Sequence, residues 1–141
     1  MTQSEKLKKY TPLKVSLGRA MMQGDLIGRF YEIFMDSSKQ IRTMFANTDM
    51  DKQKELLEHS LNLAVMFASG HPMGAQGILR IRVSHARNKR NINPEYYPYW
   101  KSSLLQALSE FDPEFDSVRK LWDEVLDITV QYIQEGYYED C

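Results

Sequence analysis

The sequence predicts an all-α domain, and three observations support this fold class. Residues that favour helices are abundant, since 14 leucines and 8 methionines stand against 14 valines and isoleucines together. Prolines and glycines lie mostly between stretches in which apolar residues recur every three or four positions. No stretch combines sustained alternation of apolar and polar residues with a hairpin turn. We therefore expect six or seven unequal helices and no sheet.

The first two helices are predicted on either side of Gly24. Thr11 followed by Pro12 is typical of an N-cap with a proline in the first turn, which predicts a helix from that point. Residues 1–10 are then an N-terminal extension. A second helix follows Gly24 and ends near Asp36. The apolar face of this second helix comprises Ile27, Phe30, Tyr31, Phe34 and Met35.

Two further helices are predicted in the middle of the chain. Thr48, with Asp51 three residues later, resembles a capping box and predicts a helix that ends at Gly70-His71-Pro72. A shorter helix follows, and it carries Ile81 and His85 on one face. The longer helix has a stripe at spacings of three and four that comprises Gln53, Leu56, Leu57, Ser60, Leu61 and Ala64.

The last two helices are predicted to open at Asn93-Pro94 and at Asp112-Pro113, where a capping residue again precedes a proline. Pro98 would remove an early hydrogen bond from the first of these helices. We therefore expect that helix either to begin one turn later or to be kinked.

Length and composition exclude several classes of protein. The 141 residues, with a mass of 16.5 kDa, are enough for one domain with a core. A net charge of −1 argues against a general binder of nucleic acid. Cys141 is the single cysteine, so neither an internal disulfide nor a cysteine-based zinc site can form. No signal-like or membrane-spanning apolar run occurs, and we expect a cytoplasmic protein.

The residues that could bind a cofactor or a metal centre on His85. Common nucleotide-binding, zinc-protease and serine-hydrolase motifs are absent, and no two of the three histidines are four residues apart. His85 follows Ile81 by one helical turn, so its imidazole should leave an apolar face. It is either a packed histidine beside a solvated loop or a single ligand for a planar metal cofactor, because one histidine can hold haem iron but not zinc. The basic residues around it, which could pair with the carboxylates of such a cofactor, are Arg80, Arg82, Arg87, Lys89 and Arg90.

The order of these residues resembles that of bacterial single-domain globins and of the globin domain of flavohaemoglobins. Phe30-Tyr31, then Phe45, then the stretch 48–53 are similar to the B helix, CD corner and early E helix of that family. The stretch 85–97 resembles the end of the F helix and the FG corner. The stretch 100–122 resembles the G helix, the GH corner and the early H helix. The resemblance covers roughly residues 13–134.

The sequence departs from flavohaemoglobins in two respects. The spacing from His85 to Ile92 is two residues longer, a spacing similar to that of some bacterial single-domain globins. The proximal glutamate of flavohaemoglobins has no clear counterpart in the last helix, where Glu135 is nearby. This second departure argues against a peroxidase-like push on the iron.

The resemblance implies a globin fold of six to eight helices around a haem pocket, as a single globin domain over residues 1–141. It implies haem b (iron protoporphyrin IX) as the cofactor. His85 would be the iron ligand, and Tyr31 and Gln53 would be the polar residues on the opposite, distal side. We expect the other cofactor-binding residues to be Phe45, which would stack on the haem, Leu57, Ile81, Arg82 and Tyr97.

The function that this resemblance implies is reversible binding of O₂ or another diatomic gas, such as NO or CO, in transport, scavenging or sensing. Donors from Tyr31 and Gln53 would favour O₂ over CO, because O₂ acquires more negative charge. Tyr31 and Gln53 could also close the sixth position of the iron. An alternative is a haem enzyme, a NO dioxygenase or peroxidase, served by an external reductase. Another alternative is a haem-free globin-fold domain for interaction or regulation, in which Tyr31, Phe45 and Leu57 are ordinary core residues. The sequence is equally compatible with a monomer and a homodimer.

Overall fold

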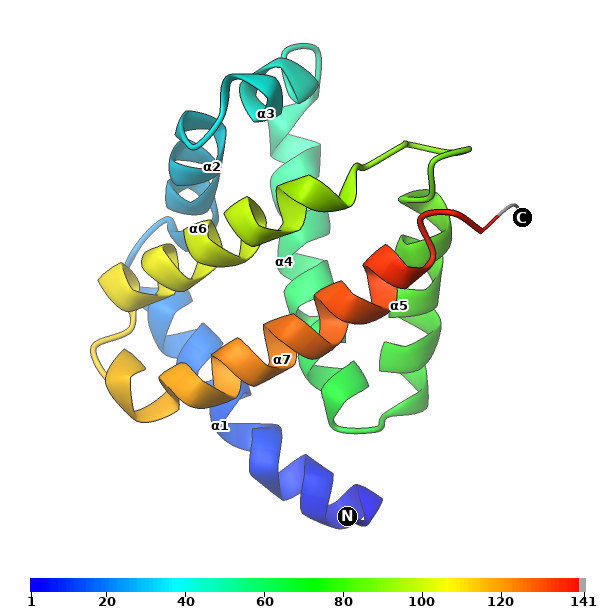
Figure 1. Ribbon diagram of the computed structural model, residues 1–141. Coiled ribbons are helices and arrows are strands. Elements are labelled where there is room, and N and C mark those ends of the chain that lie inside the picture. The colour runs from blue at the N-terminus through cyan, green and yellow to red at the C-terminus, as the bar shows by residue number, and fades with distance from the viewer. Residues whose placement is uncertain (140–141) are drawn as a thin grey trace.

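The protein is all-α, as the sequence predicts. The structure, a computed structural model, describes residues 1–139, so Cys141 lies outside the described range. Those residues contain seven α-helices, one 3₁₀ turn and no strand (Figure 1). In chain order the elements are α1 (Gln3–Gln23), α2 (Leu26–Asp36), α3 (Lys39–Met44), α4 (Met50–Ala68), α5 (Pro72–Ser84), η1 (Pro94–Tyr96), α6 (Tyr97–Phe111) and α7 (Phe115–Glu135).

The first helix begins earlier than predicted. Its N-cap is Thr2, whose hydroxyl accepts a hydrogen bond from the backbone N–H of Glu5 at 3.1 Å. The predicted start at Thr11 is wrong, since Pro12 lies inside α1 and the hydroxyl of Thr11 donates to the carbonyl of Leu7. A proline inside a helix removes one hydrogen bond. The helix continues because its buried residues on both sides of the proline pack against the rest of the protein.

Other helix boundaries shift by one to three residues. Asp49, and not Thr48, caps α4 by accepting from the N–H of Lys52. The expected later start of α6 is confirmed: Asn93 caps the 3₁₀ turn, and Pro98 lies in the first turn of α6. The last helix begins at Phe115 and not at Asp112, because Asp112 binds other groups.

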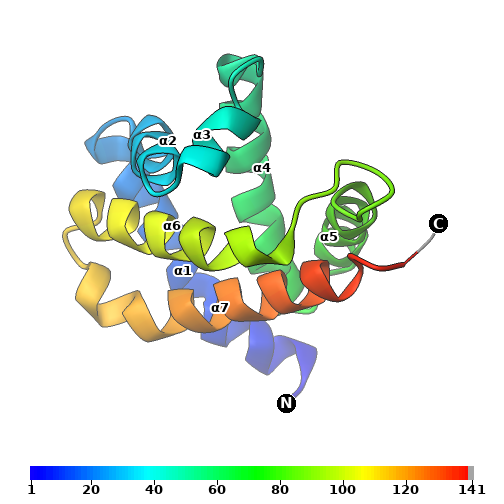
Figure 2. The same cartoon turned by 45° about the horizontal axis from the view of Figure 1, so that its top comes forward.

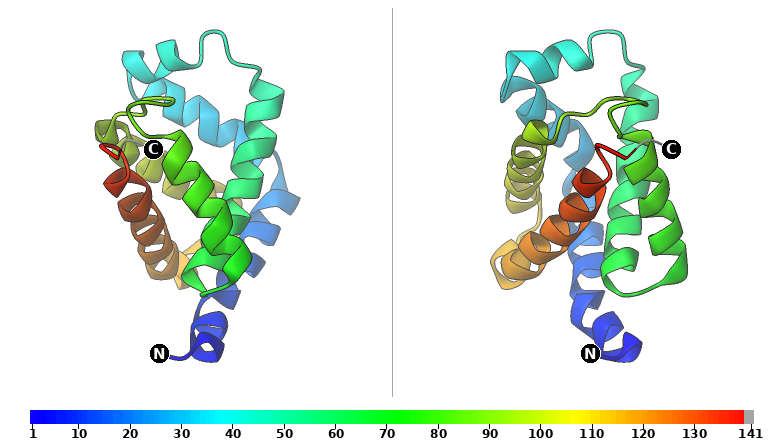
Figure 3. Two further views of the ribbon diagram at one scale, coloured as in Figure 1. Left: turned by 90° about the vertical axis from the view of Figure 1, so that its right-hand side faces the viewer. Right: turned by 45° about the vertical axis from the view of Figure 1, so that its right-hand side comes forward.

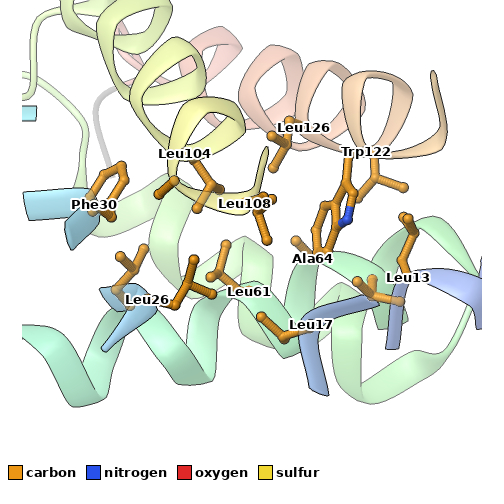
Figure 4. Packing of buried hydrophobic residues seen from close by; sticks show 14 of the residues in the cluster. Leu13, Leu17, Leu26, Phe30, Leu61, Ala64, Leu104, Leu108, Trp122 and Leu126 are labelled. Carbon is orange, nitrogen blue, oxygen red and sulfur yellow. The ribbon is translucent and has the colours of Figure 1, made fainter. Parts of the chain in front are cut away.

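Asp112 is the centre of a buried network that ties α1 to α7. Its carboxylate accepts two hydrogen bonds from Arg19, at 2.7 and 3.0 Å, and one from the hydroxyl of Ser16. Ser16 in turn accepts from the indole N–H of Trp122 at 2.9 Å. Trp122 is fully buried in the core, where Leu13 and Ala64 lie close to its indole ring (Figure 4).

Helices α4 and α5 form an antiparallel pair that carries much of the site. They lie side by side in Figure 3, and α5 also contacts α7. The close approach requires glycine at two positions of α5. A Cβ on Gly77 would come within 2.6 Å of the side chain of Leu63, and one on Gly74 within 2.3 Å of the backbone nitrogen of Phe67. Close packing therefore holds α5 against α4.

Helices α1, α2 and α7 also contact α4. Figure 2 shows α6 and α7 running next to one another, and α2 packs against α6. Of the helices within residues 1–139, none is long and apolar enough to cross a membrane.

Candidate functional site

His85 lies directly after the last residue of α5 and is partly buried. Burial and, to a smaller extent, the positive charge of Arg90 together lower the pKa of its imidazole from 6.5 to about 4. A hydrogen bond to the backbone carbonyl of Ile81 opposes these effects. The imidazole is therefore neutral near pH 7, which is the form that binds a metal.

The orientation of this imidazole is set by groups in the preceding turn. The hydroxyl of Ser84 lies 3.0 Å from Nδ1 of His85 and donates to the carbonyl of Ile81 at 2.9 Å. The imidazole bonds to the same carbonyl. No hydrogen bond of Nε2 is found within the described part of the chain. A neutral ring with its proton on Nδ1 presents the Nε2 lone pair to a further partner.

A second polar group forms between α2 and α4. The side-chain amide of Gln53 donates to the hydroxyl of Tyr31 at 3.1 Å, although the two residues are 22 apart in sequence. Only 3 % of Tyr31 is exposed, and burial raises the pKa of its phenol to about 12. Because Gln53 is the donor in this bond, the phenolic hydrogen of Tyr31 is not used in it.

Apolar residues surround this pair. The ring of Phe45 meets that of Tyr31 edge-on, with centroids 5.7 Å apart, and Leu57 is buried one turn after Gln53. Leu56, which the predicted stripe also included, is 45 % exposed and lies outside this group. The structure therefore brings together Tyr31, Gln53 and Phe45 from α2, α4 and the corner between α3 and α4.

Tyr97 lies elsewhere, at the start of α6. It is buried, and burial raises the pKa of its phenol above the usual value of 10. It lines a groove between α6 and α7, together with Pro98, Lys101, Asp127, Ile128, Val130, Gln131 and Gln134. Within residues 1–139 no hydrogen bond joins Tyr97 to His85, and the hydrogen bonds of His85 and of Tyr31 form two separate groups.

Arg82 contacts residues at the end of α7 and beyond it. Its guanidinium donates to the backbone carbonyl of Tyr132 at 2.9 Å, packs on the ring of Tyr132 at 4.6 Å and pairs with Glu139. Arg82 thus bonds to residues at and beyond the end of α7, and its expected contact with a cofactor stays a prediction. The other basic residues of the stretch, Arg80, Arg87, Lys89 and Arg90, are exposed.

Sequence reasoning missed Ser84, although a signal was present. A serine directly before a histidine at the end of a helix can bond back to a carbonyl three or four residues earlier. The other two histidines are exposed, and His71 caps α5 by accepting from the N–H of Met73 at 3.1 Å.

Proteins similar to this chain are found among known sequences and solved structures. No protein-family model matches the chain. An uncharacterised globin-like protein of Aquifex aeolicus is 29% identical over 103 residues, which cover 73% of this chain and 72% of that protein. A flavohemoprotein of Bacillus thuringiensis is 24% identical over 122 residues, or 83% of this chain, which spans only 30% of the length of that protein.

A solved structure is similar over nearly the whole chain. It is a protein of Pseudomonas aeruginosa PAO1, described as structurally highly homologous to a human hemoglobin. It is 31% identical to this chain, with a TM-score of 0.83, and the match covers 98% of this chain and 100% of that one. The helix arrangement, the resemblance seen in the sequence and this level of identity agree, and the chain belongs to the globin family.

Proposed function

We propose that this globin binds haem b and, at the haem iron, reversibly binds O₂ or another diatomic gas. The observation that carries the proposal is the placement of His85 at the end of α5, where its Nδ1 lies 3.0 Å from the hydroxyl of Ser84 and burial lowers the pKa of its imidazole. A structural histidine needs no free Nε2 lone pair, whereas an iron ligand does. The name of the flavohemoprotein relatives supports haem as the cofactor.

The residues present fit such a cofactor. His85 would hold the iron through Nε2, and the apolar side chains of Phe45, Leu57 and Ile81 would contact the ring. Tyr97, which is buried at the start of α6, is also proposed as a haem-binding residue. Arg90, whose charge acts on His85, is the cation that we propose for a haem carboxylate. When bound, haem iron supplies a coordination position that a small gas can occupy.

Tyr31 and Gln53 would set the preference among gases. The phenolic O–H of Tyr31 and the second amide hydrogen of Gln53 can both donate to an electronegative diatomic molecule. Each such bond contributes about 1 kcal/mol, and more where the acceptor carries charge. O₂ would therefore dissociate more slowly than it would from haem without these donors. CO would be stabilised less by the same two donors.

Absorption spectra of the purified, haem-reconstituted protein test this proposal. We expect a Soret band that shifts between the ferric, ferrous and CO-treated states. Replacement of the ligand, His85→Ala, should abolish stable haem uptake, while His59→Ala, an exposed histidine of α4, should leave it intact. A wild-type protein that remains colourless after reconstitution would overturn the proposal.

A second candidate function is consumption of NO with an external electron donor. The likeness to flavohemoproteins favours it, although the match spans 30% of their length. NO consumption by the haem-loaded protein with an added reductase would support this activity. Gas binding without turnover would leave reversible binding as the function.

A further inference from the structure

The C-terminal residues 136–139, which follow α7, lie against the loop after His85 (Figure 1). The carbonyl of Tyr137 accepts a hydrogen bond from the backbone N–H of Arg87 at 2.9 Å. The hydroxyl of Tyr137 donates to the side-chain carbonyl of Asn91. One residue thus holds the loop near both of its ends.

Arg82 adds a second attachment between this segment and α5. It pairs with Glu139 and donates to the carbonyl of Tyr132, so it joins α5 to residues on both sides of the end of α7. The fit is close at Gly136, where an added Cβ would come within 2.5 Å of Cγ of Arg82. Only 15 % of the Arg82 side chain is exposed.

The loop that Tyr137 holds closes directly onto His85. The N–H of Ile92 donates to the carbonyl of His85 at 3.1 Å, and the N–H of Arg90 donates to that of Ser84 at 3.0 Å. Asn91 lies between these two donors and has a φ of +54°, a left-handed conformation that is uncommon for residues other than glycine. The tyrosine therefore bonds to the residue whose backbone conformation lets both flanking amides reach the end of α5.

We propose that residues 136–139 act as a latch that fixes the loop after α5 and, through it, the position of the His85 imidazole. Tyr137 and Arg82 are positioning residues in this arrangement. The consequence for haem iron rests on the proposed function, whereas the latch itself is a property of the chain. Loss of the latch would let the end of α5 open and would loosen the orientation of the ligand.

The test compares Tyr137→Phe, which removes the hydroxyl bonded to Asn91, with Tyr138→Phe. Tyr138 is a neighbouring tyrosine that is 72% exposed, and its replacement keeps the ring beside Arg87. Amide hydrogen exchange of the haem-free protein is measured first. We expect exchange at Asn91 and Ile92 to become about five- to tenfold faster in Tyr137→Phe, since one net hydrogen bond is lost. Tyr138→Phe should match the wild type.

The same variants are then loaded with haem, and the iron–imidazole vibration of the ferrous protein is recorded. We expect Tyr137→Phe to shift this band and Tyr138→Phe to leave it in place. Glu139→Gln, which weakens the pair with Arg82, should give a smaller change of the same sign in both measurements.

Unchanged exchange in Tyr137→Phe would overturn the latch. Faster exchange with an unshifted iron–imidazole band would overturn its role in positioning His85. A wild-type protein that takes up no haem would overturn the proposed function, and the exchange measurement would still decide the latch.

Discussion

Gln53 of α4 donates a hydrogen bond to the hydroxyl of the buried Tyr31 of α2, whose ring contacts that of Phe45. This bond joins two side chains that the sequence places 22 residues apart, and it leaves the phenolic hydrogen available. Tyr31 is therefore the donor that faces a bound gas in our proposal, and Gln53 holds its oxygen in place.

Removal of the Tyr31 hydroxyl should speed release of O₂. We expect Tyr31→Phe to raise the O₂ dissociation rate about tenfold, which corresponds to about 1.4 kcal/mol, and to change the CO rate less. Stopped-flow displacement of O₂ by CO measures the first rate. Tyr99→Phe, at an exposed tyrosine of α6, is the control. An O₂ rate that does not respond to Tyr31→Phe would remove Tyr31 from the gas site.

Gln53 and Tyr31 should act together and not independently. Gln53→Leu should also raise the O₂ dissociation rate, because Tyr31 loses the donor that orients its oxygen. In the double variant we expect less than the sum of the two single effects on the logarithm of the rate, since both act on one network. If the effects of the two substitutions on the logarithm of the O₂ dissociation rate are additive, Gln53 does not act through Tyr31.

The Asp112 network should make the free energy of unfolding depend on pH in the acid range. Burial raises the pKa of this carboxyl, but hydrogen bonds from Arg19 and Ser16 outweigh it and hold the pKa below the ordinary 3.8. Because folding lowers this pKa, the contribution of the Asp112 carboxylate to the free energy of unfolding is complete above pH 3.8. It is lost as the pH falls through the folded-state pKa. Asp112→Asn should cost about 1.5–3 kcal/mol at pH 7.

Urea unfolding followed by tryptophan fluorescence from pH 7 down to pH 3 measures this effect. The gap in free energy of unfolding between the wild type and Asp112→Asn should close toward the acid end of the range. A gap that stays constant with pH would mean that the charge of Asp112 contributes nothing.

Two glycines in helices should respond in opposite directions to alanine. Gly77→Ala should lower the free energy of unfolding by about 1–3 kcal/mol, because the new methyl group overlaps Leu63 where α4 and α5 meet. Gly18→Ala places its methyl group in open space on α1 and should raise stability by about 0.5–1 kcal/mol. Thermal unfolding of both variants checks the pair, and equal effects would contradict the close packing of α4 and α5.

Most of the helices follow from local pattern, but several boundaries do not. The stretch 48–51 offers more than one capping side chain, and in the structure Asp49 is the one that caps α4. Pro12 looked like a helix start because proline favours the first turn. Helix α1 passes through it because Tyr10 on one side and Leu13 on the other are both buried.

Local spacing in the sequence indicates the surroundings of a candidate residue where its neighbours along the chain supply them. His85 follows Ile81 by one turn, so the apolar face and the carbonyl partner could be anticipated from spacing. The partners of Arg82 could not be anticipated in this way, because Tyr132 in α7 and Glu139 beyond it lie 50 and 57 residues away in the sequence. A charge three residues from a candidate ligand carries no information about which distant carboxylate it meets.

The amino-acid sequence alone determined the all-α class, the approximate helix order and the candidate residues, because helical periodicity and capping act over a few neighbouring positions. Only the tertiary structure decided that Gln53 reaches Tyr31, that Arg82 turns to Glu139 and that Tyr137 reaches Asn91. Those contacts depend on the packing of helices distant in sequence, in which close approaches such as Gly77 on Leu63 set positions that no local pattern encodes.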